Sequence, residues 1–121
     1  MKQQESQLQQ ICVQWFRDKY QELSKMLFAV PNGGFRNQSE AIRMKREGVT
    51  PGVSDLILLI PNGEFSSLCI EMKFGKGKQS DLQKEWQTET EKHGNKYIIC
   101  NSFESFKSGI EEYLKKISSK R

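Results

Sequence analysis

Two short apolar runs joined by a tight turn constrain the fold of this chain more than any other feature. The first run covers residues 56–60, the turn is Pro61-Asn62-Gly63, and the second run covers residues 68–73. Apolar runs of this length, bounded by Pro, Asn and Gly, are typical of buried β-strands. The sequence therefore predicts a β-hairpin at the centre of the fold.

The second strand carries two charges in an otherwise apolar setting. Successive side chains of a strand point to opposite faces, so Glu71 and Lys73 share one face and the apolar residues share the other. Asp55 directly precedes the first strand, at the open end of the hairpin, to which the second strand returns. The hairpin therefore predicts that Asp55, Glu71 and Lys73 meet at one point.

These three residues are of the types that hydrolysis of a phosphodiester requires. The two carboxylates can bind a hard divalent cation through oxygen, and the lysine can supply a positive group near the attacking water. The Glu-x-Lys pattern alone is weak evidence, because chance placement of 12 Glu and 14 Lys predicts about one such triplet, and one is found. The alternative for Glu71 and Lys73 is a solvent-facing edge pair that makes cross-strand salt bridges. Context favours a site, because Asp55 is one of only three aspartates.

Length and charge set the class of protein. A chain of 121 residues is large enough for one domain with a real core, covering residues 1–121, and too short for two. The net charge of +4 is permissive for a polyanionic partner. No apolar run approaches the roughly 20 residues of a membrane span, and the polar start lacks a signal peptide, which predicts a cytoplasmic protein without a membrane partner.

Cysteine and histidine usage narrows the metal chemistry. The three cysteines, Cys12, Cys69 and Cys100, are odd in number and lie in apolar segments, which indicates reduced core thiols. A zinc site is not expected, because there is no Cys-x-x-Cys motif and His93 is the only histidine.

Elements on both sides of the hairpin complete the predicted fold. We expect helices over residues 5–25, 40–47, 80–93 and 103–117, and further short strands over residues 26–30 and 97–100. Ser80 followed by Gln83 is a capping box that opens the third helix, and Trp15 and Trp86 lie in apolar stripes typical of a core or an interface. The order predicts an α/β fold with a small mixed central sheet flanked by helices.

Four segments together resemble a known family, the VRR-NUC (virus-type replication-repair nuclease) domain of the PD-(D/E)xK superfamily. They are Pro31-Asn32-Gly33-Gly34, then Gly-Val-Thr-Pro-Gly-Val-Ser-Asp-Leu at 48–56, then Ile-Glu-Met-Lys at 70–73, and Ser80 with Gln83. The resemblance implies a restriction-endonuclease-like core, cleavage of DNA that depends on Mg²⁺ or Mn²⁺, and a stand-alone form like those encoded by phages. Ser54 departs from it, because the family usually has proline before the aspartate.

The resemblance also implies roles for individual residues. Asp55 and Glu71 would be metal ligands, with the backbone carbonyl of Met72 completing the shell, and Lys73 would be the catalytic lysine. Glu5 matches an acidic residue on the first helix that reaches the metal directly or through water. Gln83 matches a glutamine that contacts phosphate or water. Each of the last two has an ordinary alternative: a carboxylate at a helix N-terminus for Glu5, and helix capping for Gln83.

Contacts to nucleic acid are expected from two loops. Lys76 and Lys78 follow the catalytic lysine and favour phosphate contact, although an ordinary solvated loop has the same composition. Asn32, Gly33 and Gly34 form a loop in which glycines allow close approach of a DNA strand, or a simple turn that ends a strand.

Three functions stay open at this point. The first is a structure-selective endonuclease acting in DNA repair, similar to a Holliday-junction resolvase, for which a homodimer places two sites on opposed strands. The second is a nicking or flap-directed nuclease. The third, from another class, is a non-catalytic module that binds DNA, and the presence of all three residues Asp55, Glu71 and Lys73 argues against it.

Overall fold

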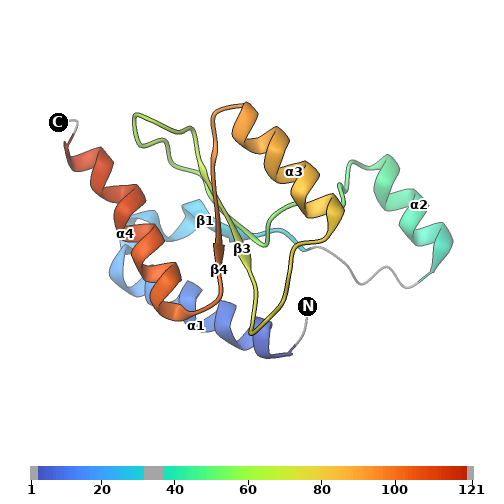
Figure 1. Ribbon diagram of the computed structural model, residues 1–121, viewed down its shortest axis with the longest axis horizontal. Coiled ribbons are helices and arrows are strands. Elements are labelled where there is room, and N and C mark those ends of the chain that lie inside the picture. The colour runs from blue at the N-terminus through green and yellow to red at the C-terminus, as the bar shows by residue number, and fades with distance from the viewer. Residues whose placement is uncertain (1–2, 32–36, 120–121) are drawn as a thin grey trace.

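A mixed β-sheet forms the centre of the computed structural model, which describes residues 3–31 and 37–119 (Figure 1). Within these residues the sheet has four strands in the order β1 (Leu27–Ala29), β2 (Leu56–Leu58), β3 (Leu68–Met72) and β4 (Lys96–Cys100). β1, β2 and β3 are antiparallel neighbours, and β4 runs parallel to β3. The predicted hairpin is therefore the centre of the sheet.

Two long helices cover one face of this sheet. Buried residues of α1 (Gln3–Lys19) and α4 (Phe103–Ser119) belong to the same hydrophobic core as alternate residues of β2 and β3. Among them Phe16, Phe106 and Ile110 are completely buried. This apolar layer fixes the helices against the sheet, because it removes large side chains from water.

The other face carries the polar residues and is covered by α3 (Asp81–Lys92). Ile98 of β4 packs against the core, so Tyr97, the residue before it, points to the opposite face. There its ring centroid lies 6.0 Å from that of Trp86 on α3. Leu68, Ile70 and Met72 belong to the core, while Glu71 lies on the face of Tyr97. The predicted division of the strand into an apolar and a charged face is confirmed.

The helix that connects β1 to β2 is set apart from this body. α2 (Gln38–Arg46) begins at the N-cap Asn37, whose side chain accepts a hydrogen bond from the backbone of Glu40. It contains no buried residue and lies at the edge of the molecule (Figure 1). None of the described helices is both long and apolar enough to cross a lipid bilayer.

The predicted boundaries differ from the structure at the hairpin and in the first helix. The strand predicted to reach residue 60 ends at Leu58, and residues 59–67 join β2 to β3 in place of a tight turn. α1 ends at Lys19 and not near residue 25, because Tyr20 leaves helical geometry and its ring packs 5.2 Å from Phe16. A short 3₁₀ helix, η1 (Gln21–Met26), then leads into β1. Trp15 packs against the core, as expected, with its ring edge toward Tyr20 and Phe106.

Candidate active site

Asp55 lies at the open end of the hairpin, beside the end of β3. The antiparallel register pairs Leu56 with Ile70, which brings the preceding residue, Asp55, next to Glu71 and Met72. Asp55 Oδ2 accepts a hydrogen bond of 2.7 Å from the backbone N–H of Met72. The neighbouring strand therefore orients this carboxylate, and the juxtaposition predicted from the hairpin is present.

The segment before Asp55 passes α3 at very close range. Gly52 has a φ of +87°, and a Cβ at this position would lie 2.5 Å from the carbonyl oxygen of Leu82. A larger residue would therefore force the loop away from α3. Ser54, which replaces the expected proline, is buried and donates a hydrogen bond of 3.1 Å to the carbonyl of Leu56. Ser54 thus stabilises the turn through a hydrogen bond instead of a ring.

Glu71 is a fully buried carboxylate, and only one of its two oxygens accepts a hydrogen bond from the described residues. Its exposed fraction is 0 %, and Oε1 accepts a hydrogen bond of 2.9 Å from the hydroxyl of Tyr97. Oε2 accepts no hydrogen bond from the described residues and lies 3.4 Å from Lys73 Nζ, an ion-pair contact. Oε2 therefore has one long ion-pair contact and no hydrogen bond within the described residues, which leaves it able to bind a cation.

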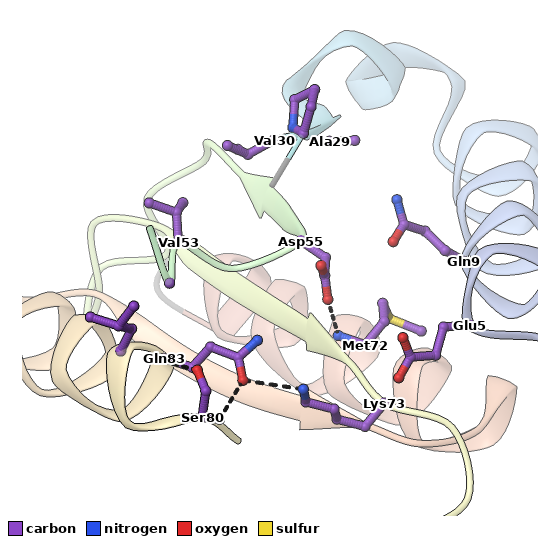
Figure 2. A pocket seen from close by; sticks show the side chains of 13 residues that line it. Glu5, Gln9, Ala29, Val30, Val53, Asp55, Met72, Lys73, Ser80 and Gln83 are labelled. Atoms are coloured by element: carbon purple, nitrogen blue, oxygen red, sulfur yellow. Dashed lines mark hydrogen bonds between the residues drawn. The ribbon is translucent and has the colours of Figure 1, made fainter. Parts of the chain in front are cut away.

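Lys73 is held in place by Gln83, the glutamine of the α3 capping box (Figure 2). Its Nζ donates a hydrogen bond of 3.1 Å to Gln83 Oε1. The same oxygen accepts a second hydrogen bond, of 2.8 Å, from the backbone N–H of Ser80. Ser80 Oγ in turn accepts from the backbone N–H of Gln83, so the predicted capping box is complete. One glutamine side chain therefore stabilises the helix start and also orients the lysine.

Burial and neighbouring negative charge disfavour the ionised forms of the two carboxylates. Burial is the main cause that raises the pKa of Asp55 and the pKa of Glu71 above their ordinary values. The negative charge of Asp55 raises the pKa of Glu71 further, whereas the ammonium of Lys73 lowers the pKa of both. Positive charge added between the two carboxylates would relieve this repulsion.

An open pocket of about 540 Å³ gives access to the site. Asp55, Met72, Lys73 and Gln83 line it from the sheet and from α3, and Glu5 reaches it from α1 (Figure 2). The negative charge of Glu5 also raises the pKa of Asp55, so the two acids face the same space. Glu71 is not part of the lining, but its Oε2 is in contact with Lys73, which is.

The basic loop after β3 lies over this pocket, but its lysines point into solvent. A Cβ at Gly77 would lie 3.5 Å from the Lys73 side chain and 3.7 Å from Glu5 Oε1. Lys76 and Lys78 are exposed and do not line the pocket. The other predicted contact loop, Asn32 to Gly34, lies outside the described residues.

The donor set fits a hard divalent cation in type. Asp55 and Glu71 supply carboxylate oxygens, which Mg²⁺ and Mn²⁺ prefer, and Glu71 Oε2 has no hydrogen bond within the described part of the chain. Within residues 3–31 and 37–119, no three His, Cys, Asp or Glu side chains lie close enough to form a complete cage. A cation here would therefore be held by the two carboxylates together with backbone or solvent oxygens, as is common for Mg²⁺.

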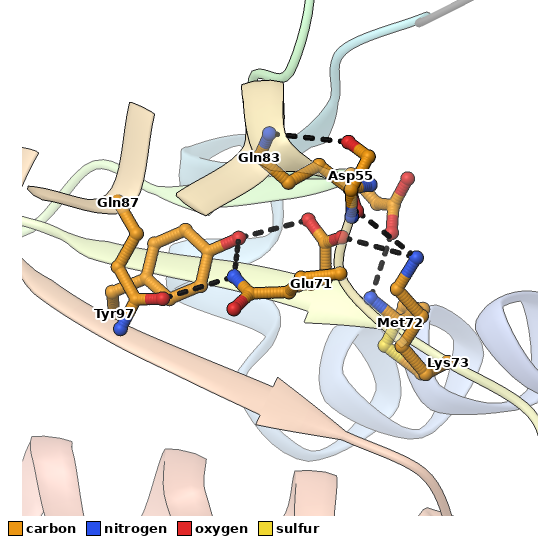
Figure 3. A network of polar contacts seen from close by, with 9 residues as sticks. Asp55, Glu71, Met72, Lys73, Gln83, Gln87 and Tyr97 are labelled. Atoms are coloured by element: carbon orange, nitrogen blue, oxygen red, sulfur yellow. Dashed lines mark hydrogen bonds and ion pairs between the residues drawn. The ribbon is translucent and has the colours of Figure 1, made fainter. Parts of the chain in front are cut away.

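Three residues at the site are absent from the sequence predictions. Tyr97 donates to Glu71, Gln79 donates to Tyr97 at 3.3 Å, and Gln79 also donates to Gln87 at 2.9 Å (Figure 3). The one available signal was a tyrosine inside an apolar strand, because a buried phenol usually has a hydrogen-bond partner. The identity of that partner depends on the pairing of β3 with β4.

The fold is an α/β fold with a restriction-endonuclease-like core. A comparison with protein families matches residues 1–104 to the VRR-NUC domain. The chain belongs to the VRR-NUC family, a family of nuclease domains, and the resemblance seen in the sequence is confirmed.

A solved structure agrees with this assignment. The chain is similar to a protein described as a "VRR_NUC domain protein", with a TM-score of 0.80 and 26% sequence identity. The similarity covers 93% of this chain and 88% of that one. No curated protein matches the chain. Membership of a nuclease family implies that the partner is DNA.

Proposed function

We propose that this protein is a DNA endonuclease that uses Mg²⁺ or Mn²⁺ to hydrolyse phosphodiester bonds. The observation that carries the proposal is the buried Glu71 Oε2, which accepts no hydrogen bond from the described residues and lies beside Asp55 and Lys73, two residues that line the pocket. A purely structural cluster would satisfy that oxygen, because leaving a buried acceptor unpaired costs about 1–3 kcal/mol.

Asp55 and Glu71 hold the cation in this proposal, with the Met72 carbonyl as a further ligand and Glu5 within reach of the pocket. The bound ion supplies positive charge to the scissile phosphate and lowers the pKa of the attacking water. Lys73 orients that water and stabilises the negative charge that develops on the phosphate. Gln83 keeps Lys73 in position, since its Oε1 is already fixed by the cap of α3.

The surface near the pocket favours a polyanionic substrate. Lys76 and Lys78 extend from the loop that follows Lys73, and both are exposed. Their ammonium groups can contact phosphates of the DNA strand that is cleaved. We assign Asn32, Gly33 and Gly34 to the same role from the sequence.

The decisive experiment compares cleavage with and without metal. Purified protein is incubated with labelled DNA in EDTA, Mg²⁺ or Mn²⁺, and cleavage is expected only with metal. Asp55→Asn should lower the rate at least about 100-fold, because loss of a ligand weakens metal binding more than loss of a supporting residue. Asp18→Asn, the same substitution at an exposed aspartate on α1, is the matched control and should cleave normally. Undiminished cleavage by Asp55→Asn would refute the assignment.

We propose that the preferred substrate is branched DNA and that the protein acts as a homodimer. Two-fold symmetry would place two active sites on opposed strands of a four-way junction. A four-way junction, a flap and a linear duplex, assayed side by side, separate a junction resolvase from a nicking or flap nuclease. Light scattering at micromolar concentration tests the dimer, and a monomer mass would count against it.

The non-catalytic alternative has a clear signature. A DNA-binding module would bind DNA equally in EDTA and in metal and would cleave nothing in any divalent cation. The arrangement of Lys73 favours catalysis, because a lysine that serves only phosphate binding has no need to be fixed by Gln83 and by a buried carboxylate.

A further inference from the structure

The Glu71 carboxylate is held from two sides by different groups (Figure 3). The Tyr97 hydroxyl donates to Oε1 at 2.9 Å, and Lys73 Nζ lies 3.4 Å from Oε2. Asp55 lies on the Lys73 side of Glu71 in Figure 3. Tyr97 therefore binds Oε1, which faces away from Asp55 and Lys73, and Oε2 faces these two residues without a hydrogen bond from the tyrosine.

The direction of the tyrosine hydrogen bond is fixed by the groups behind it. Gln79 Nε2 has two protons, and it donates one to Gln87 Oε1 at 2.9 Å and one to the Tyr97 oxygen at 3.3 Å. Because the Tyr97 oxygen already accepts from Gln79, its single proton is directed to Glu71. An ionised carboxylate only accepts, so this polarity matches the charged form of Glu71.

The tyrosine itself cannot easily rotate away. Its exposed fraction is 5 %, and its ring packs beside Trp86 of α3. Gln87, which anchors Gln79, lies on the same helix. A series of hydrogen bonds thus connects α3 to the centre of the sheet, through Gln87, Gln79, Tyr97 and Glu71. If the Tyr97 hydroxyl moved away, the buried Glu71 Oε1 would lose its donor.

We infer that Tyr97 is a positioning residue that holds Glu71 as a one-oxygen ligand, with Oε1 bound to the phenol and Oε2 presented to the divalent cation. This inference rests on the proposed function. Supporting groups around metal ligands fix ligand orientation, and their loss typically weakens metal affinity about 10- to 100-fold. Gln79 acts one step further out, by fixing the hydroxyl of Tyr97.

The test measures metal affinity without DNA and without turnover. Mn²⁺ is titrated into the metal-free full chain by isothermal calorimetry, for the wild type and for Tyr97→Phe, which removes one hydroxyl and keeps the ring. We expect the dissociation constant to rise about 10-fold or more. The Mn²⁺ concentration for half-maximal cleavage should rise in parallel, while the rate at saturating Mn²⁺ recovers.

Tyr113→Phe is the matched control. Tyr113 is equally buried, and its hydroxyl donates to the carbonyl of Ile60 at 2.6 Å, at the other end of the hairpin. Loss of this hydroxyl removes a comparable hydrogen bond without touching the site. Mn²⁺ affinity should therefore stay at the wild-type value, although the variant is less stable.

The outcomes are separable. Wild-type Mn²⁺ affinity in folded Tyr97→Phe overturns the inference and leaves the proposed nuclease intact. A wild type that neither binds Mn²⁺ nor cleaves DNA overturns both. If Tyr97→Phe does not fold, Gln79→Met replaces it, since that variant keeps the phenol but removes its donor. A weaker Mn²⁺ affinity in Gln79→Met supports the inference, and an unchanged affinity overturns it.

Discussion

The two ends of the β2–β3 hairpin each bury a polar side chain and a tyrosine, but they use them differently. At the turn, Asn62 donates to the carbonyl of Tyr113 and accepts from the backbone N–H groups of Glu64 and Phe65, while Tyr113 donates to Ile60. At the open end, Tyr97 serves one oxygen of Glu71, and the other oxygen accepts no hydrogen bond from the described residues.

This difference is the one expected between a structural cluster and the proposed active site. At the turn, the hydrogen bonds of Asn62 stabilise the fold, because they offset the cost of removing its amide from water. At the open end, burial raises the pKa values of Asp55 and Glu71, and the charges of Glu5 on Asp55 and of Asp55 on Glu71 raise them further, which means that both ionised carboxylates oppose folding. We expect this of the proposed active site, because active sites commonly contain strained or unsatisfied groups.

The largest expected effect concerns the lysine at the open end. Lys73→Ala should lower Mn²⁺-dependent cleavage about 100-fold or more, because it removes the positive group that faces the scissile phosphate. Lys96→Ala is the control at the turn end, where the exposed Lys96 lies over the ring of Phe65. Single-turnover rates with labelled DNA measure both. Equal cleavage rates in the two variants would contradict the proposal that the open end of the hairpin, and not the turn end, carries the activity.

The turn end should respond in stability and not in activity. Asn62→Ala leaves the backbone N–H groups of Glu64 and Phe65 without their acceptor, and a loss of about 2–3 kcal/mol in the free energy of unfolding is expected. Urea denaturation in EDTA measures it. The cleavage rate of the folded fraction should match that of the wild type, and a large loss of activity with unchanged stability would contradict the structural role of Asn62.

The smallest effect is the one that tests the electrostatic argument most directly. In metal-free protein, Asp55→Asn should slightly raise the stability near neutral pH. Because folding raises the pKa of Asp55, the ionised carboxylate disfavours the folded state at every pH above that raised value. The gain should shrink as the pH falls through the raised pKa, and disappear below the ordinary value of 3.8, where both states are protonated.

Thermal unfolding of both proteins in EDTA, across this pH range, is the measurement. Asp18→Asn serves as the control, since the Asp18 carboxylate is exposed on α1. A lower stability of Asp55→Asn than of the wild type at neutral pH would show that the Met72 hydrogen bond outweighs burial at this carboxylate.

The predictable part of the site was local. The alternation of apolar and charged residues in β3 sufficed to bring Asp55, Glu71 and Lys73 together, because a shift of one residue would turn the apolar side chains away from the core. The connection between the two strands, residues 59–67, is longer than a tight turn. The capping box of Ser80 and Gln83 was likewise readable, since both residues lie within one turn of helix. The end of α1 was not, because the packing of Tyr20 on Phe16 decided it.

The hairpin, its charged face and the family follow from the order of residues alone. The groups that hold those charges in place depend on how distant strands pair. Tyr97 reaches Glu71 because the parallel register pairs it with Cys69, two residues earlier on the same face of β3. A shift of one residue would turn Tyr97 toward the core, and no local pattern fixes that register, since β3 and β4 are connected through α3.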